Sequence, residues 1–192
     1  LNRCFIALRP TGPTALHIEQ SVHALNALFP NARRVQTDDL HLTLAYLGQL
    51  PTAQAGELAH ALAQEPPAAF PVATWLIDHL GYFEKARVIW LGAPASPALQ
   101  THVNSVRHML QEHAIDFDDR PFVPHVTVLR HVARHAALPP IPFPITWPLT
   151  RPVLMYTNPK TKAPAIEYLN RPKACTLGEI FVLYSEIFFH ET

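Results

Sequence analysis

The feature that most constrains how this chain can fold is an internal repeat with an offset of 84 residues. Two strand-like segments carry a histidine and a threonine two positions apart, HLTLAYLG at 41–48 and HVTVLR at 125–130. Each follows a segment with the period of an amphipathic helix, and Val22 and Val106 in those segments are also 84 residues apart. A chain that repeats a helix and a strand in one register is expected to fold into two similar halves.

The repeated unit is longer than these segments. Residues 4–30 and 87–113 each contain a short apolar run, a turn with proline and then the helical pattern. The apolar positions of the two helices recur every three or four residues, at Ala15, Ile18, Val22, Leu25 and Phe29 and at Leu99, Val103, Val106 and Leu110. We therefore predict a single domain over residues 1–192 with two pseudo-symmetric lobes, whose repeat units span about residues 3–48 and 87–130.

The other segments add a helix and further strands. Residues 52–65 have the pattern of an amphipathic helix, and strands are predicted at 70–83, 151–158 and 179–189. The proline-rich stretch 138–144 is predicted to be a loop. Helices and strands without regular βαβ alternation favour an α+β fold with mainly antiparallel sheet.

Composition limits the classes of function. The 192 residues include 15 basic and 15 acidic side chains, so the chain is not expected to bind a long nucleic acid by neutralising many phosphates. The two cysteines, Cys4 and Cys175, do not form the dense disulfide framework of a small secreted protein. Because the sequence shows no leader-like start and no apolar run of membrane-spanning length, we expect a cytoplasmic, monomeric protein that does not bind membranes.

The repeated motif suggests a chemistry. Residues i and i+2 of a strand share a face, so His41 points the same way as Thr43, and His125 the same way as Thr127. A two-fold arrangement brings both imidazoles and both hydroxyls to one surface. One imidazole can act as base and the other as acid near neutral pH, because the ordinary histidine pKa is about 6.5. The hydroxyls can donate to a phosphate that Arg130 also reaches, and this chemistry requires no metal.

These motifs resemble those of the two-histidine phosphoesterases, specifically the LigT-like RNA 2′,3′-cyclic phosphodiesterases, also called 2′-5′ RNA ligases. The resemblance rests on FIAL near the start of the chain, on HLTLAYLG and on VPHVTVLR, and it covers about residues 3–148. It implies a bilobal LigT-like fold in which two mainly antiparallel sheets form a central groove with helices outside. It also implies cofactor-free hydrolysis of a terminal RNA 2′,3′-cyclic phosphate to a 2′-phosphate, with 2′-5′ ligation as the reverse reaction.

The resemblance assigns roles to the site residues. It makes His41 the proton donor to the departing 3′ oxygen and His125 the proton acceptor that activates water, while Thr43, Thr127 and Arg130 hold the phosphate. The residues alone do not distinguish acid from base, because the two repeats are alike. They also leave open a 2′-5′ oligonucleotide or cyclic nucleotide phosphodiesterase, and a protein that binds RNA ends or small nucleotides without turnover.

The end of the chain departs from the family pattern, in which a strand of the type FVLYRS precedes a glycine-rich turn and a final short strand. Two segments could fill this place: PVLMYTN at 152–158 followed by AIEYL at 165–169, or IFVLYSE at 180–186. We favour the second on sequence likeness. In that case residues 150–178 are an insertion or a variable C-terminal segment.

The remaining histidines have simpler interpretations. His131 and His135 have a spacing that could bind a metal on a helix, but no third ligand is evident nearby, so a solvated loop is the preferred interpretation. On the helix of the second repeat we expect exposed side chains at His102, His108 and His113.

Overall fold

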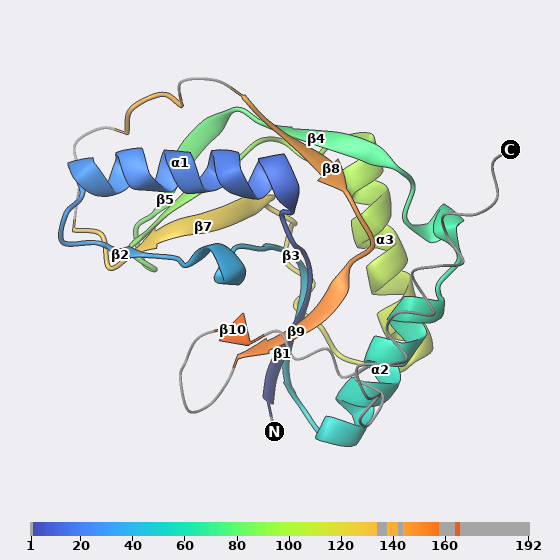
Figure 1. Ribbon diagram of the computed structural model, residues 1–192. Helices are drawn as coiled ribbons and strands as arrows, with labels where there is room; N and C mark the ends of the chain where they lie inside the picture. Colours follow the sequence, from blue (N-terminus) through green and yellow to red (C-terminus); the bar gives the residue numbers. More distant parts are fainter. Residues whose placement is uncertain (1, 134–137, 142–143, 158–163, 166–192) are drawn as a thin grey trace, which may run out of the picture.

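Two four-stranded sheets and one two-stranded sheet form the centre of the described part of the chain, and helices lie against them (Figure 1). The computed structural model describes residues 2–133, 138–141, 144–157 and 164–165. All the strand pairs formed by these residues are antiparallel. The α+β class predicted from the sequence is therefore confirmed.

The first sheet contains the strands of the first repeat. β1 (Asn2–Leu8) pairs with β3 (Leu42–Leu50) on one side and with β9 (Val153–Thr157) on the other, and β10 (Pro164–Ala165) lies beyond β9. α1 (Gly12–Leu28) follows β1 in the chain. Since β3 is the edge strand of this sheet, its other side is free to approach the second sheet.

The second sheet contains the strands of the second repeat. β6 (Val88–Gly92) pairs with β7 (His125–Arg130), and α3 (Pro97–Glu112) connects them. β5 (His79–Phe83) completes one side of the sheet and β2 (Arg33–Arg34) the other. The order of strand, helix and antiparallel strand is therefore the same in both repeat units, in agreement with the 84-residue offset.

The helices bury the apolar faces that the sequence predicts. In α3 the four predicted apolar positions are fully buried. The helix begins with Pro97, and the preceding residue caps it, because Ser96 Oγ accepts a hydrogen bond from the Leu99 amide at 3.2 Å. α1 contacts β7, α3 contacts β3, and α2 (Thr52–Gln64) contacts β9. Within the described ranges, no helix has the length and apolar character needed to cross a membrane.

The single strand predicted over 70–83 is wrong. The segment forms two strands, β4 (Ala73–Ile77) and β5, which separate at Asp78 and belong to different sheets. β4 pairs with β8 (Ile145–Leu149), a strand that sequence analysis missed. β8 has the alternating burial of a strand, but Pro148 lies within it. A two-stranded sheet tolerates this proline because each strand has one side without a partner.

The prediction that His102 is exposed is also wrong. Its side chain is fully buried against Phe70, with ring centroids 5.5 Å apart, and its Nδ1 lies 2.9 Å from the Ala98 carbonyl oxygen one turn earlier. His102 lies three residues after Leu99, so it falls on the buried side of the helix. His108 and His113 are exposed, as predicted.

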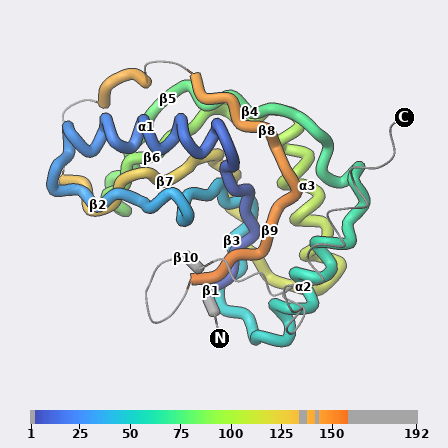
Figure 2. Tube along the Cα trace, viewed as in Figure 1, coloured from blue at the N-terminus to red at the C-terminus, as the bar shows by residue number. Residues whose placement is uncertain are grey.

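The two sheets are joined by the chain and by hydrogen bonds. After β2 in the second sheet, the chain passes through a 3-10 turn, η1 (Thr37–Asp39), and enters β3 in the first sheet (Figure 2). The Val35 amide, directly after β2, donates to the Val128 carbonyl of β7 at 2.9 Å, which keeps the start of this connection on the second sheet. The Asp118 amide, in the loop before β7, donates to the Tyr46 carbonyl of β3 at 2.9 Å and so links this loop to the first sheet. These connections hold β3 next to β7, and one hydrophobic cluster includes residues from both sheets.

The described residues bear on only one of the two candidates for the family's C-terminal strand. β9 lies within the first candidate, at 152–158, and pairs with β1. The favoured candidate at 180–186 lies outside the described residues, as does Cys175. The interpretation of 150–178 as an insertion or variable segment therefore stays a prediction.

Two glycines make room for an aromatic side chain beside the histidine of the second repeat. A Cβ atom on Gly81 would lie 2.0 Å from the indole ring of Trp90, and one on Gly92 would lie 2.6 Å from it. Both distances are far shorter than a van der Waals contact. Gly92 is also the register partner of His125, and the Trp90 ring centroid lies 6.1 Å from that of His125. The glycines thus determine where the indole ring can pack.

We predict that Gly81→Ala lowers the free energy of unfolding by roughly 1–3 kcal/mol, the usual cost of inserting an atom into a packed region. The matched control is Gly56→Ala in α2, where an added Cβ meets no atom within 4 Å. Since alanine favours a helix, this control is expected to raise the free energy of unfolding by about 0.5–1 kcal/mol. Urea unfolding measures both changes. Equal effects of the two substitutions would contradict the packing argument.

Candidate active site

The histidines of the two repeats have the same local geometry. His41 Nδ1 lies 2.6 Å from the carbonyl oxygen of Asp39, and His125 Nδ1 lies 2.7 Å from that of Val123, in each case two residues earlier in the chain. A carbonyl oxygen carries no proton, so Nδ1 must be the donor in both bonds. In the neutral rings Nε2 is then the unprotonated nitrogen. Nε2 is therefore the atom that can accept or return a proton.

Aromatic side chains shield both imidazoles from water. The ring of Phe5 on β1 lies 4.8 Å from the ring of His41, at an interplanar angle of 34°. The ring of Phe83 on β5 lies 4.9 Å from that of His125, at 87°. Such neighbours remove water from one side of each ring and thereby disfavour the charged form.

Burial lowers the pKa of both histidines. The pKa of His41 is lowered from 6.5 to about 4, mainly by burial, while the hydrogen bond to Asp39 opposes the shift and the charges of Arg130 and His125 add to it. The pKa of His125 is lowered mainly by burial, and the charge of Arg130 contributes. Both imidazoles are thus neutral near pH 7 in the free protein. Since the charge of His125 affects His41, the two rings lie within electrostatic range.

Two cavities open from the space between the sheets. The first, about 360 Å³, is named here the arginine pocket, and its lining includes His41, Thr43, Asp39 and the four arginines Arg3, Arg33, Arg34 and Arg130. The second, about 700 Å³, is named here the aromatic pocket, and its lining includes Thr43, His125 and the rings of Tyr46, Phe83 and Phe122. Thr43 and Tyr46 line both, so the cavities meet at β3 with one histidine in each.

The structure brings most of the predicted site residues together. His41, Thr43 and Arg130 share the arginine pocket, and His125 lies across Thr43 in the aromatic pocket. Thr127 is half-buried on β7, opposite Trp90 of β6, and is not among the residues that line either pocket. The roles of these five residues stay predictions.

Sequence analysis missed the other three arginines of the pocket and Phe83. Arg33 and Arg34 are adjacent in the sequence, eight and seven residues before His41, and this pair was the available signal. The sequence contains no such signal for Arg3 or Phe83, because each side chain reaches its pocket only through strand pairing.

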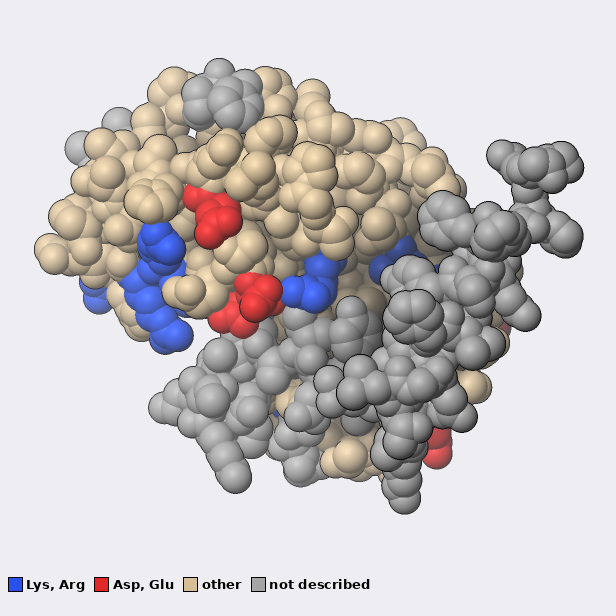
Figure 3. Space-filling model, in the orientation of Figure 1, with Lys and Arg blue, Asp and Glu red and all other residues tan. Residues whose placement is uncertain are grey.

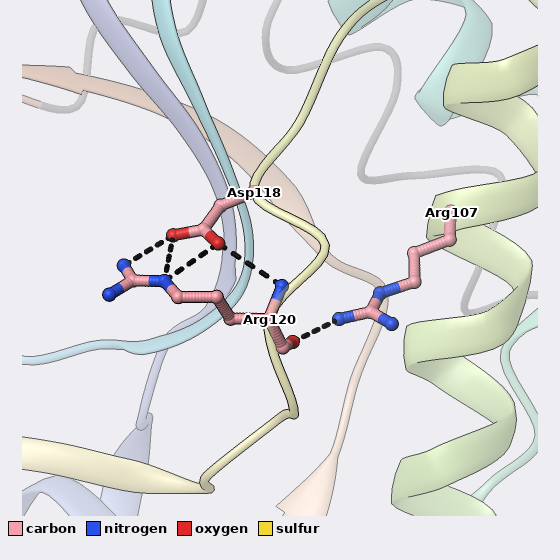
Figure 4. A network of polar contacts seen from close by, with 3 residues as sticks. All are labelled: Arg107, Asp118 and Arg120. Atoms are coloured by element: carbon pink, nitrogen blue, oxygen red, sulfur yellow. Dashed lines mark hydrogen bonds and ion pairs between the residues drawn. The ribbon is translucent and has the colours of Figure 1, made fainter.

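Polar contacts fix the loop between α3 and β7, which forms one wall of the aromatic pocket (Figure 4). The Asp118 carboxylate accepts hydrogen bonds from the guanidinium and from the amide of Arg120, and Arg107 on α3 donates to the Arg120 carbonyl at 3.0 Å. The hydrogen bonds from Arg120 lower the pKa of Asp118 to about 2. This network, together with the bond from Asp118 to Tyr46, holds the wall against β3.

Of the possible metal-binding pair, only His131 lies within the described residues, and it is not part of a helix. His131 is exposed directly after β7 and has a positive φ of 58°, and His135 lies outside the described residues. Within the described ranges, no three His, Cys, Asp or Glu side chains are grouped in a way that could hold a metal ion.

Comparison with known proteins identifies the family. The family model of the 2′-5′ RNA ligase superfamily matches residues 14–161, which include both histidine motifs. The chain belongs to this superfamily. The resemblance seen in the sequence is therefore confirmed.

Relatives and solved structures support the same family assignment. An Escherichia coli (strain K12) protein named RNA 2′,3′-cyclic phosphodiesterase is 32% identical over 125 residues, which are 64% of this chain and 69% of the relative. A crystal structure described as a phosphoesterase has a TM-score of 0.72 at 28% identity and covers 85% of this chain and 92% of its own. E. coli LigT complexed with 3′-AMP has a TM-score of 0.68 at 28% identity, with coverages of 82% and 88%. The predicted LigT-like fold is thus confirmed.

We predict that His41 stays neutral down to about pH 4, with its proton on Nδ1. Imidazole ¹⁵N chemical shifts recorded between about pH 3.5 and about pH 8, a range that includes both the ordinary histidine pKa and the lowered one, measure both properties. An ordinary titration of His41, or a proton on Nε2 at neutral pH, would contradict the geometry of the site.

The lowered pKa also affects stability. An unfolded His41 takes up a proton near its ordinary pKa of 6.5, whereas the folded residue does so only near 4. Its contribution to the free energy of unfolding therefore falls as the pH is lowered from about 6.5 to about 4 and is constant below that range. The difference between wild type and His41→Asn, measured by urea unfolding at several pH values, isolates this contribution from those of the other histidines.

Proposed function

We propose that this chain is an RNA 2′,3′-cyclic phosphodiesterase that opens the terminal cyclic phosphate of an RNA to a 2′-phosphate. The observation that carries the proposal is the matched pair of Nδ1–carbonyl hydrogen bonds, which leaves Nε2 of both His41 and His125 as the reactive nitrogen within one site. The family and the activity named for the E. coli relative support the same reaction.

In the proposed reaction, two protons move in opposite directions across one phosphorus atom. His125 Nε2 accepts a proton from water while the water oxygen forms a bond to phosphorus. The bond between phosphorus and the 3′ oxygen breaks, and protonated His41 donates its Nε2 proton to that oxygen. His125 ends the cycle protonated and His41 neutral, and exchange with solvent restores the starting forms. No metal is needed for either transfer.

The low pKa of His41 in the free protein requires an explanation, because a proton donor must begin in the protonated form. A cyclic phosphate carries one negative charge. When this charge lies beside the imidazole, it favours the protonated ring and opposes the effect of burial. Substrate binding is thus the event that we propose raises the pKa of His41, so that the acid is formed only in the complex.

The phosphate itself requires donors and positive charge. Thr127 shares a face of β7 with His125, and Thr43 lies two residues after His41, at the start of β3, so we propose that both hydroxyls donate to the non-bridging oxygens. The charge of Arg130 influences both imidazoles, which supports the proposal that its guanidinium binds the same phosphate. A guanidinium can donate two hydrogen bonds to one phosphate group.

The aromatic pocket is the proposed place for a nucleobase. Phe83 contacts the His125 ring, Tyr46 is 43% exposed, and Phe122 lines the same cavity. RNA-binding proteins commonly stack unpaired bases on such rings. His125 and Thr43 line the same cavity, so we propose that the ribose oxygens of a base bound there lie next to these two side chains.

The histidine pair would serve related substrates too. Hydrolysis of 2′-5′ oligonucleotides or of small cyclic nucleotides uses the same two proton transfers. Ligation to a 2′-5′ bond is the same ring opening with the 5′-hydroxyl of another RNA in place of water, and the high concentration of water disfavours it. The name of the E. coli relative favours the cyclic RNA end. Both histidines belong to one polypeptide, so the proposed functional unit is a monomer. The proposed compartment is the cytoplasm.

We predict that an oligonucleotide with a 2′,3′-cyclic phosphate end is converted to the 2′-phosphate in the presence of EDTA. His41→Ala and His125→Ala are each expected to lower kcat by roughly 10²-fold or more, the usual effect of losing an acid or a base. Chromatography of the product measures the rate. His23→Ala, at an exposed position on α1, is the control.

Three results would contradict the proposal. They are the absence of product with wild type, the loss of activity in EDTA, and full activity of either single variant. A protein that only binds RNA ends gives the first result. Product analysis also distinguishes a 2′-phosphate from a 3′-phosphate, which would reverse the assignment of the leaving oxygen.

A further inference from the structure

The arginine pocket contains more positive charge than one phosphate needs. Arg33 on β2 lies directly opposite Arg130 on β7 in the strand register, and Arg34 follows it on the same short strand. Arg3, the fourth arginine, lies opposite Thr157, which also lines the pocket. Against these four guanidinium groups the pocket holds one carboxylate, that of Asp39.

The opposition of Arg33 and Arg130 is unfavourable in the free protein. Like charges directly opposite each other on neighbouring strands destabilise a sheet. The pKa of Arg130 is lowered, first by burial and then by the charge of Arg33. The ion pairs of the described residues involve Asp78, Asp118 and Glu112, and none of them includes an arginine of this pocket.

Asp39 neutralises only part of this charge. It lies within electrostatic range of both Arg33 and Arg130, and its pKa is nevertheless raised, because burial and the neighbouring Asp38 outweigh the arginines. One carboxylate shared between several guanidinium groups leaves an excess of positive charge inside a cavity. A bound anion is the natural partner for such an excess.

The scissile phosphate does not account for all of the positive charge in the arginine pocket. That group carries one negative charge and is proposed to lie between the histidines, where the charge of Arg130 acts on both imidazoles and that of Arg9 on His41. The backbone of Arg130 lies three residues beyond Thr127, which is about 10 Å along a strand that rises about 3.3 Å per residue, so the Arg130 side chain has to extend back toward the histidines. Arg33 and Arg34 lie beside that far end, away from His125. They are placed for a second anion, adjacent to the first.

We propose that Arg33 and Arg34 form a subsite for a second phosphate of the substrate. The preferred substrate is then an RNA end, or another nucleotide with a further phosphate, rather than a nucleoside cyclic monophosphate. This inference rests on the proposed function, which defines the first phosphate. The zero net charge of the chain agrees with a short anionic contact rather than a long one.

Figure 3 shows how charged side chains are distributed on one face of the molecule. Basic side chains gather at the left of this view, over the part of the molecule where Figure 1 shows β2, and acidic side chains lie nearby. Further basic side chains lie toward the middle and right of the same face.

Two probes that differ by a single phosphate test the subsite. They are adenosine 2′,3′-cyclic phosphate and its 5′-phosphorylated form. We expect kcat/KM to be at least about tenfold higher for the second, since a hydrogen bond to a charged group commonly contributes a factor of ten or more. Arg33→Gln and Arg34→Gln, singly and together, are expected to reduce this ratio, and the double variant to bring it below about threefold.

The control variant is Arg151→Gln, which removes one positive charge outside both pockets. Arg151 donates to the Leu62 carbonyl and lies over the Phe70 ring. The variant is expected to leave the ratio between the two probes unchanged. Circular dichroism of each variant verifies folding. An equal fall in the ratio with Arg151→Gln would show a nonspecific effect of net charge and overturn the assignment to Arg33 and Arg34.

Product binding tests the subsite without turnover. Calorimetry compares adenosine 2′-phosphate with adenosine 2′,5′-bisphosphate, and the second is expected to bind at least about tenfold more tightly to wild type but not to the double variant. Hydrolysis of both probes at equal kcat/KM, with equal binding of both products, overturns the subsite and leaves the proposed function intact. Tighter binding of the bisphosphate without any hydrolysis supports the subsite and overturns the proposed function.

Discussion

The hydrogen bond from an imidazole Nδ1 to the carbonyl two residues earlier is the interaction on which the rest of this site depends. It occurs in both repeats, at the point where the chain is about to enter β3 or β7, and there the carbonyl oxygens of Asp39 and Val123 are free to accept it. The bond fixes the tautomer and the plane of each ring at once. Two strands with the same approach therefore present two equivalent nitrogens, and acid and base differ only through their surroundings.

Those surroundings are dominated by burial and by arginine. Both effects favour neutral imidazoles. In the proposed function, a bound phosphate opposes the second effect, because its negative charge offsets the guanidinium charge that acts on His41 and His125. The proposal therefore couples the protonation state of the pair to substrate binding. A site of this kind needs no permanently charged acid, which would be costly to maintain next to Phe5.

The parts of the fold that sequence predicted correctly are those specified by local patterns. The apolar positions from Leu99 to Leu110 and the Ser96–Pro97 helix start belong to one helix. The second His-x-Thr motif lies within β7, and the first begins one residue before β3. The errors concern residues whose environment comes from distant segments. Pro148 lies in a strand because β4 offers a two-stranded pairing, and His102 is buried because Phe70 packs against α3. The pocket arginines meet only after β2 pairs with β7.

The route of the chain between residues 33 and 41 determines whether the two repeats could exist as separate fragments. The first repeat gives its β2 to the sheet of the second repeat before it builds β3 in its own sheet. Severing the polypeptide between the halves would thus remove β2 from β7, leave β6 as the remaining partner of β7 among the described strands, and put Arg33 and Arg130 on different fragments. Although the sequence reads as two copies of one unit, the copies are interlocked, and neither is an autonomous module.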